Sequence, residues 1–330
     1  MKKFVYLSSI FALLVLISAC QQGSSDSTGT APKTPFLGGT KGLDLKFLDG
    51  SPPKEVTDSG TFPFQAIVSM KNQGEFDLKK DQVKVDLIGI LPENFGTSIE
   101  DLSGKRPQDD PSPKKRDSEG NVIEPVETFI TFPSDGSSFN FENSVTGNTP
   151  FIFRADVCYK YQTKALSRIC VLRDLINTKK NTICKPSESK KIFSSASPVQ
   201  VSSFRQTVAG QDKISFSFDI VQSGKGSVFK EGDSTSPAAD CPKDPRASRE
   251  KENKVLVNVD TKLPNLRCVG LEGTTSGYVT LVDGKRTITC TQELDSGRND
   301  FETNVDITLD FNYNDITEEQ VLVKHLIGNS

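Results

Sequence analysis

Residues 151–161, Phe-Ile-Phe-Arg-Ala-Asp-Val-Cys-Tyr-Lys-Tyr, decide the fold class of this chain. From Phe151 to Tyr161 an apolar side chain stands at every second position, with mostly polar side chains between them. A period of two is typical of a half-buried strand, because successive side chains of a strand point to opposite faces of the sheet. We find no capped segment with the 3.6-residue period of a helix.

The same period of two returns along the whole chain. Stretches with this pattern, separated by turn residues, cover 43–47, 64–70, 83–87, 129–141, 169–171, 214–220, 255–259 and 311–323. The composition agrees, because phenylalanine is frequent, with 21 residues, while tryptophan is absent. The sequence therefore predicts an all-β protein.

The second half of the chain repeats the order of the first. Gly224 lies 150 positions after Gly74, at the end of a similar strand. The positions Phe311, Tyr313, Val321 and Val323 each lie 152 after Tyr159, Tyr161, Ile169 and Val171, while Val255, Val257, Val259 and Leu263-Pro264 lie 172 after Val83, Val85, Leu87 and Leu91-Pro92. We expect two copies of one immunoglobulin-like β-sandwich, each ending in a strand, a polar loop and a second strand. The changes of offset place insertions at 99–126 and 225–253.

The N-terminus has the features of an export signal. Lys2 and Lys3 precede an apolar run over 4–17, which is too short to span a bilayer. Ile17-Ser18-Ala19-Cys20 resembles the lipobox of prokaryotic lipoproteins, which implies that Cys20 is acylated and becomes the mature N-terminus. The alternative is an ordinary cleaved signal with a chance cysteine. We expect a signal peptide over 1–19, a flexible tether over 20–41, sandwiches over 42–172 and 199–330, and a linker over 173–198.

Six cysteines remain apart from Cys20: Cys158, Cys170, Cys184, Cys241, Cys268 and Cys290. An even number in an exported chain indicates disulfides, and zinc is the alternative. Three lie in each half, so complete pairing requires at least one bridge between the halves. We expect Cys158–Cys170, Cys268–Cys290 and Cys184–Cys241, with Cys170–Cys184 as the main rival pair.

Few residues offer chemistry. His325 is the sole histidine and no G-x-S-x-G is present, so we expect no enzyme and no catalytic residues. The formal net charge of −3 does not favour nucleic-acid binding. We expect no cofactor and no metal. A weaker alternative is a calcium site formed by the loop oxygens of Asp295, Asn299, Asp300 and Glu302.

Two short motifs resemble known surface proteins. The segment 68–75, Val-Ser-Met-Lys-Asn-Gln-Gly-Glu, resembles the strand ending in Asn-x-Gly of cell-adhesion-related (CARDB-like) immunoglobulin-like domains of bacteria and archaea. Cys158-Tyr159-x-Tyr161, followed by 169–171, is similar to uncharacterised archaeal surface lipoproteins. The second copy lacks the asparagine, since Ser223 precedes Gly224.

The resemblance implies a non-enzymatic protein of the cell surface or periplasm. We expect it to be anchored to a membrane through its lipid and to bind an unknown protein or glycan as an adhesion or scaffolding module. A carbohydrate-binding, cell-wall-binding or enzyme-accessory lipoprotein is the alternative. The insertions 99–126 and 225–253 are the expected binding loops, unless they are simply flexible surface loops.

Overall fold

The computed structural model describes residues 34–134, 136–177, 182–232 and 238–326, which belong to one compact unit. Strands hold 49% of the residues and helices 6%, and the sheets are largely antiparallel, which confirms the all-β prediction. The predicted signal peptide, Cys20 and the tether up to residue 33 lie outside the described residues. No described helix is long and apolar enough to cross a membrane.

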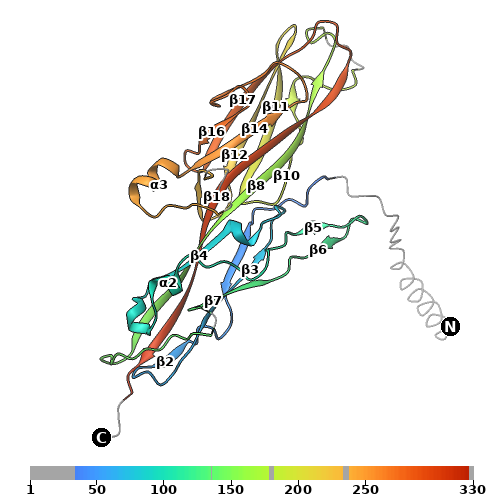
Figure 1. Ribbon diagram of the computed structural model, residues 1–330. Coiled ribbons are helices and arrows are strands. Elements are labelled where there is room, and N and C mark those ends of the chain that lie inside the picture. Colours follow the sequence, from blue (N-terminus) through green and yellow to red (C-terminus); the bar gives the residue numbers. More distant parts are fainter. Residues whose placement is uncertain (1–33, 135, 178–181, 233–237, 327–330) are drawn as a thin grey trace, which may run out of the picture. The chain divides into compact units, whose positions relative to one another are not determined.

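A large sheet runs through this unit (Figure 1). Its main path is β10 (Phe193–Ser194), β8 (Thr149–Val171), β18 (Phe301–Lys324), β14 (Lys254–Asp260) and β16 (Ser276–Thr280). β4 (Val83–Ile88) pairs with β8, while β13 (Ser227–Phe229) and β2 (Glu55–Thr57) pair with β18.

Two smaller sheets complete two sandwiches with the large sheet. Sandwich 1 contains the sheet of β1 (Leu43–Phe47), β3 (Ala66–Asn72) and β7 (Thr128–Phe132). Sandwich 2 contains the sheet of β15 (Leu266–Val269), β17 (Lys285–Glu293), β12 (Lys213–Gln222), β11 (Val199–Gly210) and β9 (Glu188–Ser189). The described helical turns and the small hairpin are η1 (Lys80–Gln82), η2 (Pro92–Phe95), α2 (Ile99–Leu102), α3 (Pro245–Lys251), β5 (Lys115–Arg116) and β6 (Val122–Ile123).

β8 and β18 are antiparallel partners from end to end, so the predicted strand–loop–strand arrangement is wrong. Val171 lies opposite Phe301 at one end of the ladder, and Thr149 opposite Val323 at the other. Residues 162–168, which we expected to form a loop, continue β8. Their inward positions are buried but weakly apolar, so the alternation fades in the sequence although the strand does not end: Thr163, Ala165 and Ser167.

The two long strands are exchanged between the sandwiches. β8 pairs with β4 in sandwich 1 and then with β10 in sandwich 2, whereas β18 runs from β14 to β2 in the opposite direction. At the centre of the ladder Lys160 lies opposite Asn312, which is 152 positions later, the offset of the repeat. Lys84 opposite Cys158 likewise corresponds to Leu256 opposite Asp310. A pseudo-twofold axis therefore relates the two copies.

This exchange changes the meaning of the predicted domains. Each of the ranges 42–172 and 199–330 contains the end of a strand that completes the other sandwich, so neither range encloses a self-contained fold. The expected linker 173–198 contributes β9 and β10 to the sheets. The core is also continuous, because Tyr159 and Tyr313 pack across the ladder with ring centroids 5.7 Å apart.

The disulfides correct two of the three expected pairs. Cys268–Cys290 is confirmed, but Cys158 pairs with Cys241 and Cys170 pairs with Cys184. Because β8 is one extended strand, Cys158 and Cys170 lie about 40 Å apart along it and cannot meet. One bridge joins the two halves of the chain, as the odd number of cysteines in each half required. Its member in the first half is Cys158 and not the expected Cys184. All six cysteines are paired, which excludes the zinc alternative and indicates an oxidising, extracytoplasmic environment.

Part of the predicted tether is attached to the folded body. The amides of Leu37 and Gly38 donate to the Glu75 carboxylate at 2.9 and 3.0 Å, and the carbonyl of Gly39 accepts from the Ser197 amide at 3.1 Å. Glu75 also accepts from the Ala196 amide at 2.7 Å. Residues 37–39 are therefore held at the junction of the sandwiches, and the expectation that the tether extends to residue 41 is wrong.

Candidate functional site

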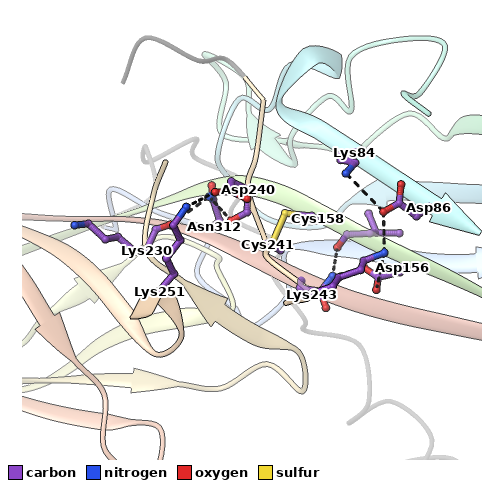
Figure 2. The surroundings of a disulfide bond; sticks show 12 residues. Lys84, Asp86, Asp156, Cys158, Lys230, Asp240, Cys241, Lys243, Lys251 and Asn312 are labelled. Atoms are coloured by element: carbon purple, nitrogen blue, oxygen red, sulfur yellow. Dashed lines mark hydrogen bonds and ion pairs between the residues drawn. A yellow bond between two sulfur atoms is a disulfide. The ribbon is translucent and has the colours of Figure 1, made fainter. Parts of the chain in front are cut away.

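Two carboxylates lie side by side at the junction of the sandwiches (Figure 2). Asp86 of β4 and Asp156 of β8 are direct cross-strand neighbours, and their side chains are only 12% and 11% exposed. Like charges in this arrangement repel each other. Lys243 compensates, because its Nζ lies 2.7 Å from Asp86 Oδ2 and 3.5 Å from Asp156 Oδ2. Asn314 also donates to Asp156.

The pKa directions agree with a stable ion pair. Burial acts to raise the pKa of Asp86, but hydrogen bonds from Lys243 and from the Gly104 amide outweigh it, so this pKa is lowered. Burial acts to lower the pKa of Lys243, but the two carboxylates outweigh it and raise this pKa. Both groups therefore carry their charges at neutral pH, and the pairing holds there.

The second insertion crosses the outer face of the large sheet at this point. We call its described residues 230–232 and 238–243 the strap. The strap is bound to the centre of the ladder by the Cys158–Cys241 disulfide. Asn312 fixes it further, since its Nδ2 donates to the carbonyl oxygens of Lys230 at 3.3 Å and Asp240 at 3.0 Å. The strap therefore covers the pseudo-twofold axis.

The two predicted insertions meet at one residue. Asp86 accepts from the Gly104 amide of the first insertion at 2.6 Å and from Lys243 of the second at 2.7 Å. At Asp86 both insertions are therefore attached to the folded body, and their expected role as binding loops stays a prediction.

A second candidate site is a cavity at the end of sandwich 2 that is remote from the junction. We call it the distal cavity. It lies beside the last pair of the β8–β18 ladder and has a volume of about 820 Å³. The described residues that line it come from three loops: Leu172, Arg173, Asp174, Ile176, Asn177, Thr182, Gln211, Ser296, Asn299 and Asp300.

Arg298 holds these three loops together. Its side chain is 4% exposed and pairs with Asp212, with Nη1 2.6 Å from Oδ1. Nε donates to the carbonyl of Leu172 at 2.7 Å, and Nη2 to that of Gln211 at 2.8 Å. A buried guanidinium with partners on several loops fixes their relative positions, because each of its donors has a set direction.

The structure does not bring the four calcium candidates together. Asn299 and Asp300 line the distal cavity, whereas Asp295 and Glu302 line two other hollows. Within the described ranges no group of three His, Cys, Asp or Glu side chains could hold a metal ion. The structure therefore gives no support for a calcium site at these four residues, and this alternative stays a prediction.

No protein-family model matches this chain, and no curated protein is significantly similar to it. The resemblances noted in the sequence therefore remain predictions.

His325 has a partner within the fold. Its Nδ1 lies 2.7 Å from Oδ2 of Asp58, which is fully buried. Asp58 also accepts from the amides of Leu326 at 2.9 Å and Val145 at 3.1 Å. These bonds fasten the end of β18 to sandwich 1.

Several residues of these sites could not be recognised from the sequence. Asp86 and Asp156 lie in different strands 70 positions apart, and their contact depends on pairing that no local pattern encodes. Only Arg298 could have been noticed in the sequence. An arginine among the acidic residues of the loop 295–302 argues against a cation site there and suggests that it pairs with carboxylates.

Proposed function

We propose that this protein is a lipid-anchored, extracytoplasmic binding protein without catalytic activity. Acylation of Cys20 would anchor it to a membrane, and the loops at the end of sandwich 2 would bind its partner. Two acyl chains are enough to hold a protein stably on a bilayer.

The observation that carries this proposal is that the junction between the sandwiches is held rigidly, while a cavity at the far end of sandwich 2 opens to solvent. The exchanged strands, the strap disulfide and the ion pair of Lys243 leave little freedom between the sandwiches. Recognition commonly resides in loops positioned by such a rigid β framework. Residues 37–39, where the tether joins the body, are held at the junction and are not among the described residues that line the distal cavity.

Localisation of the full chain in a bacterial host tests the anchor. We expect the wild type to remain in carbonate-washed membranes and to yield a mature N-terminus at an acylated Cys20 by mass spectrometry. Cys20→Ala should not be acylated, whereas Gln21→Ala should behave as the wild type. An unacylated wild type, or equal membrane retention of Cys20→Ala through another segment, would show that the anchor is not Cys20.

A further inference from the structure

We propose that the β5–β6 hairpin of the first insertion contacts the lipid surface to which the chain is anchored. This inference rests on the proposed acylation of Cys20 and goes beyond it, because it gives the folded body a membrane contact of its own. The hairpin forms a separate two-stranded sheet, with Lys115 opposite Ile123 and Arg116 opposite Val122. It projects from sandwich 1 (Figure 1).

The hairpin is fixed at its base and at its turn. At the base the Lys114 amide donates to the carbonyl oxygen of Gly74 at 2.9 Å. At the turn Asp117 Oδ1 accepts from the amides of Glu119 at 2.9 Å and Asn121 at 2.8 Å. A two-stranded hairpin is only marginally stable by itself, so these bonds help to keep it ordered. Its exposed side chains therefore have defined positions.

Three of these exposed side chains are apolar. Val122 is 45% exposed, Ile123 43% and Val126 70%. Val122 and Ile123 are successive strand residues and point to opposite faces, so each face of the hairpin carries an apolar side chain. A single exposed apolar residue is common in any protein, whereas three within five positions of a projecting hairpin indicate a contact surface.

The place where the tether reaches the body identifies the lipid surface as the occupant. Arg116 Nη1 donates to the carbonyl and the hydroxyl oxygens of Thr34, each at 3.4 Å, so the first described residue is held against the hairpin. Cys20 lies 14 positions before Thr34, and an extended chain of that length spans at most about 50 Å. Acylation therefore keeps the hairpin close to the bilayer. Residues 21–33 contain no apolar side chain larger than proline, so the tether offers little cover for the patch.

Tethering makes a weak contact sufficient. An anchored group meets the surface at a high effective concentration, so a contact that is too weak to bind a free protein becomes populated. The hairpin has three basic residues at 114–116 and three acidic residues, Asp117, Glu119 and Glu124, so its charges balance. We expect the contact to depend on apolar burial and to require no anionic lipid.

A single tryptophan reports the contact, because the wild-type chain contains none. The acylated full chain with Ile123→Trp is reconstituted into phosphatidylcholine vesicles with and without bromine on the acyl chains. We expect the brominated lipid to remove about half of the emission or more, since interfacial apolar groups lie at the boundary of headgroups and acyl chains. Cys20→Ala/Ile123→Trp, added to the same vesicles, should keep its emission.

Two control variants separate the contact from the affinity of tryptophan for interfaces. Leu91→Trp should not be quenched, because Leu91 is 65% exposed in the segment between β4 and α2, and α2 lies apart from the hairpin (Figure 1). Val122→Ser/Val126→Ser in the Ile123→Trp background should lose most of the quenching. Equal thermal stability of these variants shows that the change is not lost folding.

An acylated Ile123→Trp chain without quenching would overturn the proposal, as would equal quenching of Leu91→Trp or full quenching in the serine variant. A blue shift without quenching would show that protein, for example a second copy, covers the hairpin, and would overturn it as well. A chain that mass spectrometry shows to be unacylated at Cys20 would instead overturn the proposed anchor and this inference together.

Discussion

Asn72 and Gly74 form a turn that receives the hydroxyl of Tyr161. Asn72 is fully buried, and its Oδ1 accepts from the Gly74 amide at 3.1 Å and from Tyr161 Oη at 3.2 Å. A Cβ on Gly74 would lie 1.6 Å from that hydroxyl oxygen. In the second copy a Cβ on Gly224 would similarly lie 2.2 Å from the hydroxyl oxygen of Tyr313. The motif that resembles adhesion domains therefore has a packing reason in this fold.

Gly74→Ala tests this turn. The methyl group would overlap Tyr161 Oη and would also approach the backbone carbonyl of Ala196 to 2.8 Å, so neither neighbour can yield freely. We expect a loss of about 1–3 kcal/mol in the free energy of unfolding by guanidinium chloride. Gly210→Ala, where a Cβ finds only a contact of 3.8 Å, should cost less than half as much. Equal losses for both variants would contradict the close approach.

Asp58 should make stability sensitive to acid. Hydrogen bonds, first from the Leu326 amide and then from His325, hold the pKa of Asp58 well below its usual range. A carboxylate whose pKa is lowered in the folded state stabilises the protein above its unfolded pKa of about 3.9 and loses this effect as the pH falls through the folded value. We expect Asp58→Asn to melt below the wild type at pH 7, with a flatter dependence between pH 5 and 2. The exposed Asp49→Asn should keep the wild-type profile, and a steep profile in Asp58→Asn would contradict this role.

At the scale of elements, strands with a strong alternation were predictable and their partners were not. β3, β4, β12 and β14 follow clear period-two patterns. Residues 162–168 were not predicted as part of a strand because their buried residues, Thr163, Ala165 and Ser167, are polar or small and break the apolar alternation. The pairing of β8 with β18 depends on a register between segments 152 positions apart. The pairing of Cys158 with Cys241 could not be predicted either, because it depends on the path of the strap over β8, which is a tertiary feature.

The strap disulfide should contribute more stability than the shorter bridge. Cys158–Cys241 closes a separation of 83 residues and Cys170–Cys184 one of 14. Removing a cross-link restores chain entropy to the unfolded state, and more for a longer loop. We expect Cys158→Ser/Cys241→Ser to lose about 2–4 kcal/mol in guanidinium chloride unfolding, and Cys170→Ser/Cys184→Ser about 1–2 kcal/mol less than that. A larger loss in the second variant would contradict the role assigned to the strap.

At the scale of the whole molecule, strand exchange makes the two sandwiches one folding unit. The sequence indicated both copies and their offset, but it predicted independent domains because the exchange leaves no local mark. The distal cavity was also only partly foreseeable. Asn299 and Asp300 stood out as oxygen-bearing residues, yet Arg173 and Gln211 reach the same cavity from loops that are distant in sequence. A binding site at the end of an immobilised framework is the functional consequence that we propose.

Hydrogen exchange of residues 162–168 tests the exchanged ladder most directly. Because this segment lies inside β8 and pairs with β18, we expect it to exchange as slowly as residues 153–159 in a mass-spectrometric time course on the native protein. Both segments should then lose protection together on global unfolding. Exchange of 162–168 within seconds, as in a solvated loop, while 153–159 stay protected would contradict the continuous strand and the interlocked fold built on it.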